Sequence, residues 1–407
     1  YKKESFKCWY VQTTGIWKSV WLEFVKPHYL LNVKNTPNYD TEDLSLVVET
    51  NILMEEFAKH IYELCVEIFD NGNVINKKCY ELMQNNQELN ISIYADGGVS
   101  KKWGILSPNI YDIKYTLFED GNLTDTVNSY FGVRKIEIKK DKIYLNGEEL
   151  YQKLILDQGY WKESHLTPPN EEALINDIDN IVRFGYNGVR KHQKNEDERF
   201  LSLCDKKGLL VWSEMANCYE FTDDAILQFS KEWMNVLKQN YNHPSIITWV
   251  PINESWGVPN VRASEKEQAY INQLYYLTKA FDNTRPVICN DGWEHTISDI
   301  ITIHDYKQEA KELEKLYTVD KAKVFDENIN YNGDRSLMAS GYSYNGQPVI
   351  MSEYGGIALV SDSGWGYGKQ VSTEEELFER FEQLTNSIKQ IDYLSGYCYT
   401  QLTDVQQ

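Results

Sequence analysis

Two glutamates, each at the end of an apolar run, have the clearest chemical potential in this sequence. Glu254 follows the run SIITWVP and has Asn253 before it, and Glu353 ends the run PVIMSE. Two carboxyl groups that face one pocket can hydrolyse a glycosidic bond, because one can donate a proton to the leaving oxygen while the other attacks the anomeric carbon. A carboxyl separation of about 5–5.5 Å gives retention and one of about 6.5–9.5 Å gives inversion. The pair predicts glycoside hydrolysis and leaves its stereochemistry open.

Both glutamates belong to a series of apolar runs that alternates with amphipathic segments after about residue 150. The amphipathic segments span 171–184, 223–240, 263–281 and 373–390. Eight strands alternating with helices over about 250 residues predict a (β/α)8 barrel, with an open doubly wound sheet as the alternative. No GxGxxG motif follows the first run, so nothing favours a nucleotide crevice. The eight runs are KLILD (153–157), NGVRK (187–191), LLVWSEM (209–215), SIITWVP (245–251), PVICND (286–291), ITIHD (301–305), PVIMSE (348–353) and LSGYCYT (394–400).

The ends of these runs carry polar groups. In a barrel of this kind, the functional groups lie at the carboxyl ends of the strands. Several of the end residues are carboxylates, which exceeds what solvation of the rim requires. We therefore expect them to converge on one pocket. The end residues are Asp157, Arg190 with His192, Glu214, Asn253 with Glu254, Asn290 with Asp291, His304 with Asp305 and Tyr306, Glu353 with Tyr354, and Thr400 with Gln401.

The first third of the chain shows short β-rich segments separated by turns. Residues 1–25 include WYVQTTGIWKSVWLEFV, whose apolar spacing close to two predicts the closing strands of a β-sandwich. Residues 26–137 predict an immunoglobulin-like sandwich with Asn-Gly or Asp-Gly hairpins in FDNGN, EDGNL and IYLNGEEL. We therefore expect a multidomain β plus α/β protein that ends in a barrel over 138–407. We also expect the last barrel helix to be missing and the opening YKKESFKCWY to come from the middle of a longer protein.

Composition restricts the partners. The net charge of −20 argues against nucleic acid, and no apolar run is long enough to span a bilayer. The seven cysteines are scattered without a CxxC pair, which predicts free buried thiols in a reducing compartment and makes zinc improbable. A cytoplasmic location follows from that prediction. The 29 Tyr and 11 Trp suit stacking on sugar rings but also suit large β-rich cores. An acidic surface is compatible with a neutral glycan and with a homo-oligomer.

The motifs NHPSIITWVPINESWG and VIMSEYGG resemble those of glycoside hydrolase family 2, the β-galactosidase, β-glucuronidase and β-mannosidase group. GYNGVRKH is similar to the second-strand signature of that family, and TTGIWKSVWLE resembles the end of its sugar-binding jelly roll. The resemblance covers nearly the whole chain. It implies a remnant of the jelly roll over 1–25, an immunoglobulin-like sandwich and a catalytic TIM barrel. It also implies retaining double displacement.

The resemblance implies a role for each matching residue. Glu254 would be the general acid/base and Glu353 the nucleophile. Asn253 would bind the sugar 2-hydroxyl, Tyr306 would orient the nucleophile, and Arg190 would pair with its carboxylate. The remaining candidates would line the pocket: His192, Asp157, His304 and Trp365.

Three departures from the family pattern qualify these roles. His192 comes two residues after Arg190 rather than three, which puts its role in doubt. SEMANCYEF lacks the acid-x-His pair with which some galactosidases hold magnesium, so we expect no catalytic metal and no cofactor. YTQLTD has no Trp at the eighth strand end, so Trp365 or Trp256 would supply an aromatic platform.

The sequence favours an exo-acting β-galactosidase and leaves alternatives open. A β-glucuronidase uses the same fold and mechanism, with a cation for the sugar carboxylate in a motif that would lie beyond Gln407. An arabinosidase or galactofuranosidase is also compatible. A non-catalytic carbohydrate-binding barrel ranks low, because it would lack at least one of the two glutamates. In every case the partner is a carbohydrate.

Overall fold

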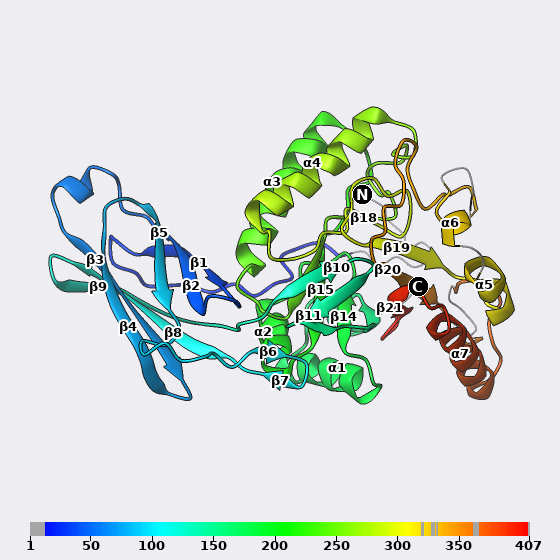
Figure 1. The fold of residues 1–407 in the computed structure, drawn as a ribbon, viewed down its shortest axis with the longest axis horizontal. Coiled ribbons are helices and arrows are strands. Elements are labelled where there is room, and N and C mark those ends of the chain that lie inside the picture. Colours follow the sequence, from blue (N-terminus) through cyan, green and yellow to red (C-terminus); the bar gives the residue numbers. More distant parts are fainter. Residues whose placement is uncertain (1–12, 319–320, 327–329, 331–332, 361–365, 406–407) are drawn as a thin grey trace.

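The structure is a computed structural model that describes residues 13–318, 321–326, 330, 333–360 and 366–405. A β-sandwich forms one end of the molecule, and a helix-wrapped parallel sheet forms the other (Figure 1). Among the described helices, none combines the length and the apolar character that crossing a bilayer requires.

The sandwich consists of two antiparallel sheets. Alternate side chains of both sheets, such as Leu46, Val48, Leu64 and Tyr115, share one buried core. Two antiparallel sheets with a shared core therefore lie within the region for which a sandwich was predicted. One sheet has the order β1 (Leu30–Pro37), β2 (Asp43–Thr50), β5 (Asn86–Ser92), and the other has the order β4 (Asn73–Leu82), β3 (Tyr62–Asp70), β8 (Tyr111–Glu119), β9 (Asn122–Phe131).

The predicted hairpin turns are all present. Asn71-Gly72 joins β3 to β4, and Asp120-Gly121 joins β8 to β9, each with two positive φ angles. Such angles match the right-handed twist of the flanking strands, and Asn, Asp and Gly tolerate them best. Asn146-Gly147 makes the same turn in a small sheet before the barrel. The short elements outside the two sandwich sheets are η1 (Glu56–Ala58), β6 (Trp103–Gly104), β7 (Ser107–Pro108), β10 (Ile136–Lys139), β11 (Lys142–Leu145) and β12 (Glu148–Glu149).

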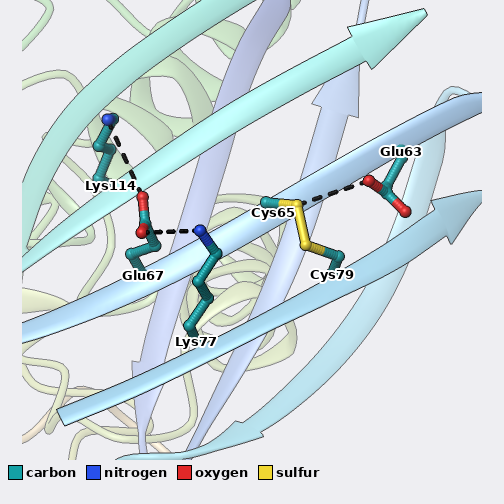
Figure 2. Close-up of a disulfide and its surroundings, with 6 residues drawn as sticks. All are labelled: Glu63, Cys65, Glu67, Lys77, Cys79 and Lys114. Carbon is teal, nitrogen blue, oxygen red and sulfur yellow. Dashed lines mark hydrogen bonds and ion pairs between the residues drawn. A yellow bond between two sulfur atoms is a disulfide. The ribbon is translucent and has the colours of Figure 1, made fainter. Parts of the chain in front are cut away.

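The cysteine prediction is wrong for one pair. Cys65 in β3 and Cys79 in β4 form a disulfide (Figure 2). The two residues are directly opposite each other in the antiparallel register, which a scan for CxxC spacing does not detect. Cys204, Cys218, Cys289 and Cys398 are free, as expected, and Cys8 lies outside the described residues. Because disulfides are typical of oxidising compartments, the cysteines no longer support a cytoplasmic location.

Residues 13–25 contain no strand, so the described part of 1–25 does not show the predicted sandwich strands. A strand needs a neighbour to complete its hydrogen bonds, and no described segment pairs with this one. Ile16, Leu22 and Phe24 are exposed. The segment instead lies against the barrel, where the Thr167 hydroxyl donates to the Trp17 carbonyl at 2.8 Å.

All eight predicted runs contribute to the barrel. Seven form one parallel sheet, whose strands are buried on both faces. The fifth run is regular only at β18 (Asn290–Asp291), which pairs with β17 (Ile252–Asn253), while the Ile288 amide donates to the Trp249 carbonyl at 2.9 Å. The seven strands have the order β16 (Ile246–Val250), β15 (Leu210–Glu214), β14 (Gly188–Lys191), β13 (Gln152–Asp157), β21 (Leu394–Thr400), β20 (Val349–Gly355), β19 (Ile301–Asp305).

Helices cover the outside of the sheet. The four expected helices are α1 (Glu171–Arg183), α3 (Asp223–Asn240), α4 (Glu265–Phe281) and α7 (Glu374–Lys389). Each begins after a side chain that accepts a backbone N–H of the first turn, namely Asn170, Thr222, Ser264 and Thr373. The sequence did not predict the shorter α2 (Glu198–Lys207), α5 (Ala310–Tyr317) and α6 (Lys321–Val324), because few turns give a weak helical period.

The sandwich contacts the beginning of β16. The Arg134 guanidinium donates to the Pro244 carbonyl at 2.9 Å and to the Ile246 carbonyl at 2.8 Å. The Asn242 side chain donates to the Val33 carbonyl at 2.8 Å and accepts from the Asn35 amide at 2.8 Å. These hydrogen bonds attach the start of β16 to the sandwich, and β16 is the strand that leads to Glu254.

Candidate active site

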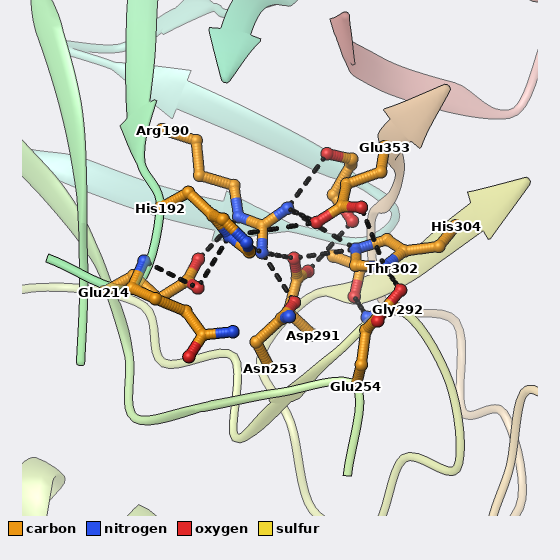
Figure 3. Close-up of polar contacts among 12 residues, drawn as sticks. Arg190, His192, Glu214, Asn253, Glu254, Asp291, Gly292, Thr302, His304 and Glu353 are labelled. Carbon is orange, nitrogen blue, oxygen red and sulfur yellow. Dashed lines mark hydrogen bonds and ion pairs between the residues drawn. The ribbon is translucent and has the colours of Figure 1, made fainter. Parts of the chain in front are cut away.

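Arg190, at the end of β14, is the centre of a buried polar cluster (Figure 3). Its guanidinium nitrogens lie 2.7 Å from Glu214 Oε2, 2.8 Å from Asp291 Oδ2 and 2.7 Å from Glu353 Oε1. The Arg190 side chain is fully buried. Burial disfavours its charge, but the three carboxylates outweigh burial and raise the pKa of Arg190. One cation therefore joins the ends of four strands of the barrel.

Glu353 is held by donors on both carboxylate oxygens. Arg190 contacts Oε1, and the Tyr306 hydroxyl donates to Oε2 at 2.5 Å. Burial raises the pKa of Glu353. The nearby His304, Arg190 and His192 lower this pKa by more, so the net shift is downward. A carboxylate held ionised and in one orientation has the properties of a nucleophile.

Glu254 is placed by a turn directly after β17. Glu254 and Ser255 have φ angles of +52° and +57°, an uncommon conformation that neighbouring bonds maintain. The Glu254 amide donates to the Asp291 carbonyl at 2.9 Å, and the Ser255 amide donates to Asn290 Oδ1 at 2.8 Å. The Glu254 carboxylate oxygen lies 2.8 Å from His304 Nδ1, and its side chain is 23% exposed. It is thus accessible to solvent, unlike Glu353, whose side chain is 4% exposed.

The two glutamates face each other across the mouth of the barrel. One oxygen of Glu254, one oxygen of Glu353 and His304 Nδ1 all lie within 4.8 Å of one another. Asn253 accepts from Arg190 Nη2 at 2.7 Å through its side-chain oxygen. The site thus combines two acidic side chains, one accessible and one buried, which is the pair of groups that glycoside hydrolysis uses, and an adjacent amide.

Of the other predicted site residues, His192 lies beside the cluster and Asp157 lies away from it. His192 lies 3.0 Å from Glu214 and 3.9 Å from Glu353, so it borders the cluster. Asp157 is buried against Lys191 at 2.6 Å and does not line the cavities at the barrel mouth. Trp365 lies outside the described residues.

Two adjoining cavities above the cluster have empty volumes of about 740 and 810 Å³. They share Gln158, His192, Glu353 and Tyr367, so they form one opening at the carboxyl ends of the strands. Trp256, named as a possible platform, lines one of them. These volumes include space that is open to solvent.

The sequence did not single out several lining residues. Tyr367 stacks on Tyr306 with ring centroids 3.6 Å apart, but it belongs to a loop without periodicity. Gln158 donates to Gln401 at 2.7 Å, which links the ends of the first and eighth strands. Gln158 follows Asp157 at the end of β13, and this position was its only sequence signal, whereas Gln401 was already among the residues expected at the strand ends.

Within the part of the chain that the structure describes, two groups of side chains have the spacing of a metal site. Glu63, Cys65 and Cys79 form one, but both sulfurs are in the disulfide. Glu254, His304 and Glu353 form the other, and each of these groups already has a hydrogen-bond partner within the cluster. The second group is therefore linked by hydrogen bonds within the cluster.

Residues 136–398 match the family described as glycosyl hydrolases family 2, TIM barrel domain. The chain belongs to glycosyl hydrolase family 2. The match includes Arg190, Glu254 and Glu353, so the polar cluster at the barrel mouth lies within the part of the chain that matches the family.

Known relatives of this family 2 chain carry several sugar specificities. The beta-galactosidase of Lactococcus lactis is 27% identical over 371 residues, covering 88% of this chain and 33% of that protein. The putative beta-glucuronidase of Formosa agariphila is 25% identical over 291 residues, covering 69% of this chain and 34% of that protein. The chain thus spans about a third of the length of these curated relatives.

Solved structures of the family show the same fold. The beta-galacturonidase from Eisenbergiella tayi bound to galacturonate has a TM-score of 0.72 and 20% identity, covering 93% of this chain and 65% of that chain. A beta-glucuronidase from Bacteroides uniformis also has a TM-score of 0.72 and 20% identity, covering 92% of this chain and 47% of that chain. At this identity the likeness concerns the fold alone.

Proposed function

We propose that this family 2 chain is the catalytic part of a retaining, exo-acting β-glycoside hydrolase. The observation that carries the proposal is the approach of Glu254 and Glu353, whose nearest carboxylate oxygens lie within 4.8 Å. Carboxylate oxygens this close favour the retaining arrangement, in which the carboxyl groups lie about 5–5.5 Å apart and the second carboxylate attacks the sugar directly, with no water molecule between them. The inverting alternative needs about 6.5–9.5 Å.

The two steps follow from the positions of the glutamates. Glu254 donates a proton to the glycosidic oxygen while Glu353 attacks the anomeric carbon, which breaks the glycosidic bond and forms a glycosyl ester. Glu254, now a carboxylate, takes a proton from water, and the resulting hydroxide attacks the ester and releases Glu353. Arg190 donates a hydrogen bond to the side-chain oxygen of Asn253. The NH₂ group of Asn253 is therefore left to donate to the sugar 2-hydroxyl.

For the sugar, we propose a β-galactoside, with a β-glucuronide as the alternative. Among the described residues that line the two cavities there is no Lys or Arg, while Asp404 lines one of them. The carboxylate of a uronic acid needs a cation as its partner, and Asp404 would instead repel that carboxylate. A binding-only barrel is disfavoured because both glutamates are present and in contact with the cavities. The division into a jelly-roll remnant at 1–25, an immunoglobulin-like sandwich at 26–137 and a barrel at 138–407 is part of the same proposal.

The full-length protein should hydrolyse nitrophenyl β-galactoside faster than the matching β-glucuronide, β-galacturonide, β-mannoside and α-arabinoside. The measurement is kcat/KM for each glycoside under identical conditions. Preference for a uronide would contradict the argument from Asp404. Hydrolysis of none of them by a folded protein would contradict the proposed activity on simple β-glycosides.

Glu254→Ala should lose activity on glycosides with poor leaving groups by about 10²–10⁴-fold, because the leaving oxygen no longer receives a proton. On an activated nitrophenyl glycoside, azide should restore turnover and yield a β-glycosyl azide. Azide attacks the glycosyl ester without needing a base, so the second step no longer requires Glu254. Unchanged activity without azide would assign Glu254 a structural role, and an α-glycosyl azide would contradict retention.

A further inference from the structure

One of the two cavities at the barrel mouth has an aromatic wall. Tyr219, in the loop after β15, and Trp256, in the turn after β17, both line this cavity. Their rings meet edge to face, with centroids 6.2 Å apart and planes at 83°. Tyr219 is 63% exposed and Trp256 is 37% exposed. Two large rings are therefore presented to a molecule that enters the cavity from solvent.

The two glutamates border the two cavities differently. Among the described residues that line the cavities, Glu353 borders both, whereas Glu254 borders only the one with the aromatic wall. In the proposed reaction Glu353 attacks the anomeric carbon, and Glu254 protonates the oxygen between the sugar and the leaving group. The leaving group therefore extends past Glu254, and Trp256 follows Glu254 by two residues. The sugar lies between the glutamates, so the aromatic wall lies beside the leaving group.

Hydrogen bonds hold the two loops of this wall together. The Asn217 side chain accepts from the Asn253 amide at 2.8 Å and donates to the Pro251 carbonyl at 3.0 Å. A Cβ at Gly257, where φ is +81°, would lie 3.1 Å from the Cys218 carbonyl oxygen, so the loops also pack closely. The rings are thus held in place before a ligand arrives, which lowers the entropic cost of binding.

Two polar side chains of this wall are already bound within the protein. Asn217 uses its side-chain oxygen and its NH₂ group in the bonds between the loops, and Gln193 Oε1 accepts from the Asn217 amide at 3.2 Å. The neighbouring Ala216 offers no polar side chain. A second sugar ring would need partners for several hydroxyl groups, whereas an aromatic ring needs only flat apolar surface. The wall therefore suits an aromatic group better than a sugar.

We propose that Tyr219 and Trp256 form the leaving-group subsite and that this subsite takes an aromatic group, so that the substrate is an aryl β-glycoside. The inference rests on the proposed function, because the roles of Glu254 and Glu353 define the side of the leaving group. An aromatic ring that enters can stack on one ring and meet the other edge-on, the two arrangements that aromatic pairs prefer. The wall acts until the leaving group departs, so it affects the first step of the reaction and not the hydrolysis of the glycosyl ester.

Trp256→Ala and Tyr219→Ala test the subsite with phenyl and hexafluoroisopropyl β-galactoside. The two leaving groups have similar acidity, but only phenol is flat and aromatic, so the chemistry is matched and the stacking is not. Each variant of the full-length protein should lower kcat/KM for the phenyl glycoside by about tenfold more than for the hexafluoroisopropyl glycoside. Trp256→Phe keeps a ring and should recover most of that difference.

Tyr276→Ala is the matched control, since Tyr276 in α4 is 60% exposed, packs edge to face against Tyr275 and does not line the cavities. Its ratio of the two kcat/KM values should stay at that of wild type. Equal losses on both glycosides in Trp256→Ala and Tyr219→Ala would overturn the proposal. A loss as large on a disaccharide with the same terminal sugar would assign the wall to a second sugar ring and overturn the aromatic assignment.

Binding to the Glu353→Gln protein tests the subsite without turnover. By calorimetry, phenyl β-galactoside should bind this variant about tenfold more tightly than methyl β-galactoside, and adding Trp256→Ala should remove the difference. Equal affinities for the two glycosides in Glu353→Gln would overturn the proposal. If the wild-type protein hydrolyses no glycoside, the proposed function fails, and the difference in affinity still decides whether the wall binds an aromatic ring.

Discussion

Glu353→Gln should lower kcat by about four orders of magnitude or more while the protein stays folded. The amide has nearly the same shape as the carboxylate, and its single oxygen can still accept from either Arg190 or Tyr306, but it cannot form the glycosyl ester. The loss should appear equally for substrates with good and poor leaving groups, because the first bond to the sugar is missing in both cases. The measurement is kcat on activated and unactivated glycosides, with circular dichroism as the check on folding.

Glu267→Gln is the matched control for this substitution. Glu267 in α4 is a similarly buried glutamate that does not line the cavities. Its carboxylate accepts a hydrogen bond from the backbone amide of Asn260 at 2.7 Å. Its turnover should stay within about tenfold of wild type. In wild-type protein quenched during turnover, the mass of the sugar should appear on the peptide that contains Glu353. Substantial residual turnover in Glu353→Gln, or the sugar on another peptide, would remove Glu353 from the nucleophile role.

Arg190→Met should lower the free energy of unfolding by about 3–5 kcal/mol at neutral pH. Methionine fills part of the volume, but Glu214, Asp291 and Glu353 lose the cation that compensates their charges in a fully buried site. Burial raises the pKa values of Glu353 and Asp291, but His304 and Arg190 lower them by more, so the stability that these pairs contribute is present at neutral pH and decreases as the carboxylates take up protons. The deficit of the variant should therefore shrink as pH falls below about 4, the value for an unfolded carboxyl group.

Lys139→Met is the control for Arg190→Met, since Lys139 pairs with Glu137 at 3.1 Å on the surface and is 53% exposed. Lys139→Met should lower the free energy of unfolding by no more than about 1 kcal/mol, because water already screens such a pair. Urea unfolding of the three proteins at neutral and acidic pH gives the comparison. If Arg190→Met cost no more than Lys139→Met, the buried cluster would not depend on its cation.

The sequence by itself determined the order of the barrel strands and which residues would be at their ends. Apolar runs separated by amphipathic segments can satisfy their backbone hydrogen bonds and bury their side chains in few ways, and the carboxyl ends of parallel strands then meet on one face. Glu254 and Glu353 could therefore be singled out although 98 residues lie between them. The turns at Asn71, Asp120 and Asn146 were predictable for a local reason, the φ angles that such hairpins require.

Only the tertiary structure decided which strand-end residues contact one another. Asp157 and Arg190 both follow apolar runs, yet Asp157 contacts Lys191 outside the cavity whereas Arg190 joins three carboxylates inside it. Adjacent residues of a strand point to opposite faces, so a strand end does not reveal which side chain enters the site. The Cys65–Cys79 bond likewise depended on cross-strand register. The position of His304 beside Glu254, Asp291 and Glu353 likewise depended on the tertiary structure, because these carboxylates come from three other segments and no sequence spacing contains the distances between them.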